Sequence, residues 1–218
     1  METTISPIIH FFISEGVPFQ TIILLLMLPV IATFIALLRQ VIGFKAFGIY
    51  TPLITTFAFL ATNGLRYGVA IFLVIIFIGM LMRFVLKPFR LLYLPRVAIM
   101  LTIVSLVILT MLVFGGNLKR TGLASVSIFP ILIMITLVEK FIAAQIEKGS
   151  KAALILAFET LIISILGFYI ASWETLIGLL IAHPWTILLT IPLNILIGKW
   201  TGLRVSEYFR FRSIIKKI

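Results

Sequence analysis

The 218-residue sequence contains no cysteine and no aspartate, so its seven acidic residues are all glutamate. The absence of cysteine excludes disulfide bonds and thiolate metal sites. Histidine occurs only twice, at His10 and His183, which is too few for a histidine-based metal cluster. Without aspartate, a facing pair of catalytic aspartates inside a membrane is also excluded. The sequence therefore lacks the residues of the most familiar metal and intramembrane protease sites.

Apolar residues are what the sequence has in abundance. They account for 62% of the chain, and the mean hydropathy is +1.26. A helix needs ~20 apolar residues to cross a hydrocarbon core ~30 Å thick. Seven apolar stretches are bounded by charge, glycine or proline, at residues 19–42, 47–62, 67–86, 94–114, 123–144, 152–171 and 176–198. The pattern predicts an all-α, polytopic integral membrane bundle of seven transmembrane helices.

The basic residues between these stretches are sorted onto one side of the predicted membrane. If every stretch crosses, 15 of the 18 lysines and arginines lie in the gaps 39–50, 83–96 and 139–151 and in the tail from residue 199. Because basic residues are retained on the cytoplasmic side, the N-terminus is predicted outside and the C-terminus in the cytoplasm. The net charge of +11 is dispersed over helix ends, which argues against a nucleic acid partner.

The predicted domain organisation has three parts. Residues 1–18 form a short extracytoplasmic tail, residues 19–200 form the membrane domain, and residues 201–218 form a cytoplasmic tail. The cytoplasmic tail mixes aromatic and aliphatic residues with arginine and lysine. Such a basic amphipathic segment is typical of a helix that lies on anionic lipids at the membrane surface.

Two of the seven stretches are interrupted. In the second stretch, Gly48 and Pro52 leave only residues 53–62 as clean apolar sequence, which is about 15 Å of helix. In the seventh stretch, His183 precedes Pro184. Interrupted helices are tolerated at membrane depth only where protein or water satisfies the backbone, and in transporters such breaks bind ions or substrate. The second stretch is either a short packed helix or a functional break.

Glu159 is the most deeply placed ionisable residue. It lies seven residues past the start of the sixth stretch, roughly 10 Å into the membrane. A charged group costs ~2.5 kcal/mol or more at the centre of a membrane helix. Glu159 is therefore expected to be protonated or paired with a cation, with Arg39, Arg96 and Lys140 as candidates. It either couples protons or pairs with a substrate, or it is a structural acid hydrogen-bonded to a neighbouring helix.

Other polar residues lie near the ends of the apolar stretches. Arg39 and Gln40 end the first stretch, and Glu139 and Lys140 end the fifth. Both pairs mark the membrane interface in one interpretation. In the other, they face inward and form a polar cluster with Arg96, Asn194 and Glu207.

No catalytic or cofactor-binding motif is present in the sequence. There is no Gly-x-Ser-x-Gly, no His-Glu-x-x-His and no Walker loop. His183, near the middle of the seventh stretch, either relays protons or hydrogen-bonds a neighbouring backbone group. No cofactor is expected, and an intramembrane enzyme is the weaker class of function.

Several blocks of sequence point to a known family. Residues 39–43 and 47–52 together, and residues 193–207, resemble the signature of the bacterial seven-transmembrane-helix domain usually fused to an inactive transglutaminase-like domain. Residues 94–98, the stretch from 129 to 141 and residues 210–212 are also similar. The resemblance gives weight, without roles, to Arg39, Gln40, Gly43, Gly48, Pro52, Glu139, Asn194, Gly198, Gly202, Arg204 and Glu207.

The resemblance implies a prokaryotic inner-membrane protein with a transglutaminase-like domain on the extracytoplasmic side, which fits the orientation deduced from charge. It also implies an association with ATP-grasp ligases on the cytoplasmic side. We therefore expect a membrane subunit or anchor for soluble partners, which handles a small polar or peptide solute. The alternative is a stand-alone secondary transporter or channel, with Glu159 and the broken second helix at its site.

Overall fold

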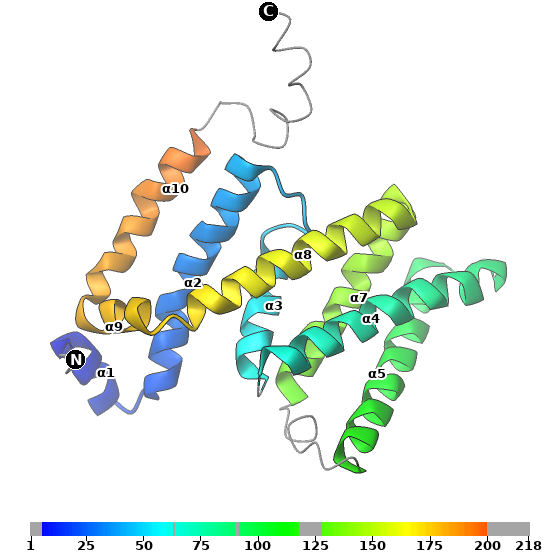
Figure 1. The fold of residues 1–218 in the computed structure, drawn as a ribbon, viewed down its shortest axis with the longest axis horizontal. Helices are drawn as coiled ribbons and strands as arrows, with labels where there is room; N and C mark the ends of the chain where they lie inside the picture. The colour runs from blue at the N-terminus through cyan, green and yellow to red at the C-terminus, as the bar shows by residue number, and fades with distance from the viewer. Residues whose placement is uncertain (1–5, 63, 90–91, 118–127, 200–218) are drawn as a thin grey trace, which may run out of the picture. The chain divides into compact units, whose positions relative to one another are not determined.

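The computed structural model describes residues 6–62, 64–89, 92–117 and 128–199, and Figure 1 shows its helices. Within these ranges all regular structure is helical. Five helical segments are long and apolar enough to cross a membrane: Phe19–Ile42, Leu65–Leu86, Tyr93–Val113, Phe129–Lys148 and Ser150–Ala171. They correspond to the first, third, fourth, fifth and sixth predicted stretches. The prediction of an all-α, multi-pass membrane protein is confirmed.

The second and seventh stretches are interrupted, as the sequence predicts. The second contains α3 (Tyr50–Ala61), whose 12 residues are too few to span a bilayer alone. The seventh is divided into α9 (Glu174–Ala182) and a continuation through η3 (Pro184–Leu189) and α10 (Thr190–Gly198), bent by 106° at the break. Among the described residues there are thus five candidate spans, or six with the bent pair. The count of seven stays a prediction.

The chain divides into two compact units. The first unit consists of Met1–Lys45 and Tyr169–Ile218, and the second unit is Ala46–Phe168. Helix α8 (Ser150–Ala171) begins in the second unit and ends in the first.

In the first unit, a short helix precedes the first span. The helix α1 (Pro7–Ser14) packs against α2 (Phe19–Leu37) and α9 through the buried side chains of Ile9, Ile22 and Ile181. The N–H of Ser6 also donates a hydrogen bond of 3.2 Å to the Ile181 carbonyl. The sequence prediction treats residues 1–18 as a tail and does not include α1. The predicted cytoplasmic tail, residues 201–218, lies outside the described residues.

Helix α2 is followed by a single wider turn. It passes through Pro29 without ending and continues into the π-helical turn η1 (Leu38–Ile42). That turn stops at Gly43, whose φ of +96° is a left-handed conformation that glycine adopts without steric cost. Helix α10 packs along α2 in the same unit.

The second unit is built around α7 (Ile128–Lys148), which contacts α3, α4 (Leu65–Leu86) and α5 (Tyr93–Asn117). Helices α4 and α5 form a hairpin (Figure 1). The core contains the fully buried rings of Phe59, Phe72 and Phe141. Gly79 allows α4 to approach α7 closely, since an added Cβ would lie 2.8 Å from the ring of Phe141.

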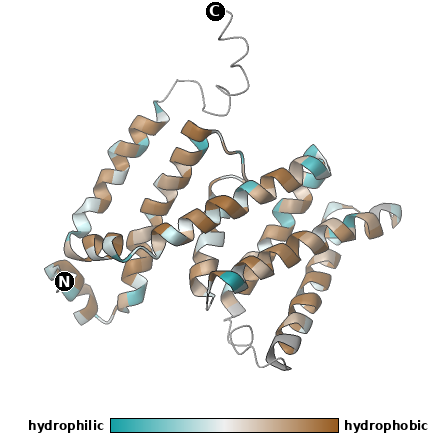
Figure 2. Ribbon diagram, in the orientation of Figure 1, coloured by the Kyte–Doolittle hydropathy of each residue, from teal (hydrophilic) through white to brown (hydrophobic). Residues whose placement is uncertain are grey.

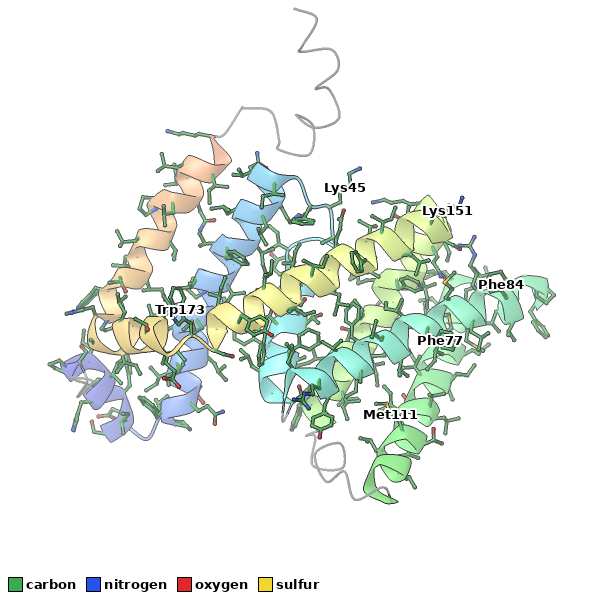
Figure 3. The ribbon with its side chains drawn as sticks, viewed as in Figure 1. Lys45, Phe77, Phe84, Met111, Lys151 and Trp173 are labelled. Atoms are coloured by element: carbon green, nitrogen blue, oxygen red, sulfur yellow. The ribbon has the colours of Figure 1, made fainter. Side chains whose placement is uncertain are left out.

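The outer surface of the second unit is apolar. Phe77 and Phe84 of α4 are 69% and 65% exposed, and Figure 3 labels both side chains. Figure 2 shows hydrophobic residues along the length of the helices. Exposed aromatic and aliphatic side chains over whole helices are expected where lipid rather than water surrounds the protein.

Candidate functional site

The segment before α3 has an irregular backbone. Residues Ala46–Ile49 form a turn between η1 and α3. Ala46 has a φ of +39° and Gly48 a φ of +80°, so two of its four residues are left-handed. Only glycine visits that region without steric cost, and Ala46 is the single non-glycine residue in the described chain that does so. A conformation of this kind persists only where surrounding contacts hold it.

Glu159 and Thr160 of α8 provide those contacts. The N–H of Ala46 donates to Oε2 of Glu159 over 2.8 Å, and the N–H of Phe47 donates to Oγ1 of Thr160 over 3.1 Å. Two consecutive backbone amides of the turn are therefore satisfied by adjacent side chains of one helix. Ala46 and Thr160 are buried, whereas Glu159 is half-buried. We call this set, Ala46–Ile49 with Glu159 and Thr160, the Glu159 site.

The polar contact continues along α3 and α8. The hydroxyl of Ser164 lies 3.1 Å from the carbonyl oxygen of Pro52 and 2.8 Å from that of Thr160. The hydroxyl of Thr56 donates to the Pro52 carbonyl over 2.8 Å. At Gly167, an added Cβ would lie 2.6 Å from Oγ1 of Thr56, so the two helices are as close as glycine permits. Small and hydroxyl side chains are the usual means by which membrane helices approach closely.

The chemistry available at this site is that of a carboxyl group near backbone donors. Ionised Glu159 accepts the Ala46 N–H as a charge-assisted hydrogen bond, which is stronger than a neutral one. Protonation of the carboxyl weakens that bond and adds a donor. Among the described residues no group of three potential ligands is placed to hold a metal ion.

Three of the predicted site residues come together here. Gly48 is in the turn, Pro52 is in the first turn of α3, and Glu159 is the acceptor that holds the segment. Glu159 accepts a hydrogen bond from a backbone N–H of the turn before α3, whereas the structural interpretation expected a partner on a neighbouring helix. This hydrogen bond is compatible with a proton-coupling role as well.

Two further predicted residues lie elsewhere in the second unit. Glu139 of α7 is exposed, and Tyr93 at the start of α5 hydrogen-bonds to it. Arg96, also of α5, lines a cavity together with Arg83 and Gln145. Glu139 is thus exposed rather than inward-facing, whereas Arg96 lines the cavity.

The remaining predicted residues belong to the first unit or are not described. Nδ2 of Asn194 donates to Oγ1 of Thr33 over 2.7 Å and joins α10 to α2. His183 is exposed at the break between α9 and η3, and its carbonyl accepts the N–H of Thr186 over 3.0 Å. Arg39 and Gln40 lie in η1, and their side chains are half-buried. Arg204 and Glu207 lie outside the described residues.

Sequence reasoning missed the residues that complete the Glu159 site. Thr160 and Ser164 are four apart on α8, and Thr56 faces them from α3. A signal was present, because three polar residues at 159, 160 and 164 interrupt an otherwise apolar helix on one face. The left-handed conformation of Ala46 has no such signal in the sequence.

Comparison with known proteins gives one match. The family model described as seven transmembrane helices usually fused to an inactive transglutaminase matches residues 5–215. No curated protein and no solved structure matches the chain. The matched range covers all the described helices, including the Glu159 site. The chain therefore belongs to this family of membrane domains with seven transmembrane helices, usually fused to an inactive transglutaminase.

Proposed function

We propose that this chain is the membrane subunit of an assembly that handles a small polar or peptide solute, with the Glu159 site as the contact for that solute or a coupled proton. The observation that carries the proposal is the hydrogen bond between the Ala46 N–H and Glu159. It supplies a titratable group to an irregular segment of a membrane domain.

Helix lengths support a position of this segment inside the bilayer. If Lys151 marks the membrane surface, Glu159 lies eight residues further along α8, about 12 Å deep. The 12 residues of α3 add about 18 Å of helix. Together these lengths equal the ~30 Å of a hydrocarbon core. The turn thus lies level with Glu159, and α3 spans the remaining thickness of the core.

Irregular backbone at membrane depth is characteristic of solute and ion sites. It is tolerated only where protein or a water-filled cavity satisfies its polar groups. In transporters, the ends of short helices at such breaks bind ions and charged substrate groups. Gly48 leaves open space beside this turn, since an added Cβ would meet no atom within 4 Å. These features favour a solute or proton contact over a purely structural role.

Proton movement offers a test that requires no knowledge of the solute. The purified chain is reconstituted into vesicles that contain a pH-sensitive dye, and a pH step is applied outside. We expect proton entry that Glu159→Gln abolishes and that Glu174→Gln, at the exposed start of α9, leaves unchanged. Equal rates for the wild type and Glu159→Gln would refute coupling through this residue.

The partners of the assembly follow from the family. Its members are usually fused to a transglutaminase described as inactive, and a fold kept without its chemistry is more suited to binding than to catalysis. We propose a transglutaminase-like partner on the extracytoplasmic side and a soluble ATP-grasp-like ligase on the basic cytoplasmic side. This division of labour also makes an enzymatic role of the membrane domain the weaker alternative.

Co-purification tests the partners. The tagged chain, isolated from its own cells in mild detergent after cross-linking, should bring down a ligase-like or transglutaminase-like protein. Lys148→Gln with Lys151→Gln should reduce recovery of the cytoplasmic partner, because both lysines are exposed at the predicted cytoplasmic end. Arg66→Gln is the matched control, because Arg66 is exposed at the start of α4, on the predicted extracytoplasmic side. Isolation of a lone chain under these conditions would contradict the proposal.

A stand-alone secondary transporter or channel is the second candidate. The interrupted seventh stretch, with its 106° bend beside His183, favours it, because transporters often contain two broken helices. Transport of a solute by the reconstituted chain without any partner would favour this candidate, whereas flux that appears only on addition of partners would favour the subunit.

We infer an inner-membrane location with the N-terminus outside and the C-terminus in the cytoplasm. The support is the excess of basic residues in alternate gaps. A C-terminal alkaline phosphatase fusion should be inactive, and a fusion after residue 117 should be active. The opposite pattern would reverse the orientation.

A further inference from the structure

A cavity of about 400 Å³ lies in the second unit, away from the Glu159 site. It is enclosed by the end of α4, the start of α5, the end of α7 and the first residue of α8. Four of its lining residues are polar, namely Arg83, Arg96, Gln145 and Ser150. All four lie at one end of the unit, the end that charge sorting assigns to the cytoplasm.

The cavity contains hydrogen-bond donors without acceptors. Gln145 is 4% exposed, and its Nε2 has no hydrogen-bond partner among the described residues. The Nε of Arg96 is also buried and without a partner in the same part of the chain. Buried donors are nearly always paired in native proteins, because an unpaired one loses its hydration without compensation. Two such donors on one cavity wall indicate a missing acceptor.

The charge of the cavity defines the kind of acceptor. Among the described residues, two guanidinium groups line it and no carboxylate does. Arg83 is held at this place because its Nη1 donates to the Gln145 carbonyl over 3.2 Å. The planar fork of arginine matches the oxygens of phosphate and carboxylate groups, which it binds with two parallel hydrogen bonds. The ligand is therefore an anion with several oxygens.

The rest of the lining is apolar and reaches the exposed surface. It consists of Met82, Phe84, Met100, Ile142 and Ile146. Phe84 and Ile146 are also exposed, 65% and 51%, and Figure 3 labels Phe84 near the end of α4. A ligand that fills this cavity has an anionic head beside the arginines and an apolar part beside Phe84. We infer that the cavity binds a phosphate group, with an anionic membrane phospholipid as its source.

Lipid retention measured by native mass spectrometry tests this inference. The wild-type chain in mild detergent is incubated with phosphatidylglycerol or with phosphatidylcholine, whose phosphate is neutralised by its choline. We expect selective retention of phosphatidylglycerol. Arg96→Gln should weaken it about tenfold or more, because it removes both the charge and the buried Nε donor. Arg66→Gln, which removes a cation from the other end of α4, should leave it unchanged.

Further arms distinguish the source of the phosphate and guard against misfolding. Inorganic phosphate alone should not bind the lipid-free chain in an isothermal titration experiment. If phosphate does bind and the binding depends on Arg96, the phosphate site is real but its ligand is a free ion rather than a lipid. Arg83→Gln changes an exposed side chain and should also weaken lipid retention. Its circular dichroism spectrum and elution volume should equal those of the wild type, which would show that the variant is folded. Retention of phosphatidylglycerol unaffected by both arginine variants, together with no phosphate binding, would overturn the inference.

Discussion

The backbone N–H of Ala46 donates a hydrogen bond of 2.8 Å to Oε2 of Glu159, across 113 positions of sequence. The donor belongs to a left-handed residue in a turn, and the acceptor belongs to the middle of α8. This bond holds the irregular turn that precedes α3, a helix too short to span a membrane. It gives the glutamate in this apolar helix a polar partner.

Removal of the Glu159 acceptor should destabilise the protein. Glu159→Leu leaves the Ala46 N–H unpaired, which costs about 1–3 kcal/mol. For a chain of this size each kcal/mol lowers the melting temperature by ~2–4 °C. Glu159→Gln keeps an oxygen acceptor and should lose less. Thermal melting in detergent, followed by tryptophan fluorescence, measures the melting temperature of both variants. An equal decrease for the two variants would show that the hydrogen bond to Glu159 does not contribute to stability.

Gly48 should be sensitive to substitution because of its backbone rather than its surroundings. An added Cβ meets no atom within 4 Å, but the φ of +80° is strained for any L side chain. Gly48→Ala should therefore cost about 1–2 kcal/mol. Gly198→Ala is the control, since Gly198 is also unobstructed but does not have a left-handed φ. That variant should be neutral or slightly stabilising in the same melting experiment. A neutral Gly48→Ala would contradict the described turn.

Gly167 tests the close packing of α3 on α8. An alanine there places its Cβ 2.6 Å from Oγ1 of Thr56, an overpacking expected to cost about 1–3 kcal/mol. Thr56→Ala removes the obstructing atoms and should restore part of the loss in the double variant. The two substitutions should thus be non-additive in a thermal double-mutant cycle. Strict additivity would show that the two residues are not in contact.

The pair of Asn194 and Thr33 should contribute only modestly to the first unit. Interhelical hydrogen bonds in membrane proteins average about 0.6 kcal/mol in double-mutant cycles. Thr33→Val and Asn194→Leu should therefore each have a small effect, with a coupling energy near that value. A coupling of zero would indicate that α10 does not pack on α2 as described. Recovered folded protein after urea titration gives the free energies.

The architecture was largely predictable because the bilayer imposes a simple rule. Stretches of about 20 apolar residues must be helical when every backbone group is satisfied internally. The interruptions at Gly48, Pro52 and Pro184 were predictable for the same reason, since glycine and proline break that rule locally. Helix α1 was not, because the eight residues of Pro7–Ser14 are too short for a distinct pattern.

The candidate site was predictable only in part. Glu159 was identified from its depth in an apolar helix, but its hydrogen-bond partner is a backbone amide, which has no sequence signature. The partnership depends on the left-handed Ala46, a residue type that rarely adopts this conformation. Similarly, nothing in the sequence around Gln145 marks it as a site residue, and the fold is needed to show that its Nε2 has no partner among the described residues and that it lines a cavity with Arg83 and Arg96. Tertiary contacts of this kind are not encoded in local patterns.

The most direct test of the central claim is the reactivity of Glu159 in the membrane. Dicyclohexylcarbodiimide enters bilayers and modifies protonated carboxyl groups, and the seven glutamates of this chain are resolved by peptide mass spectrometry. If the Glu159 site exchanges protons at membrane depth, Glu159 should be modified at low reagent concentration, with labelling that decreases as the pH rises. Modification of the exposed Glu147 and Glu174 with none at Glu159 would contradict the account.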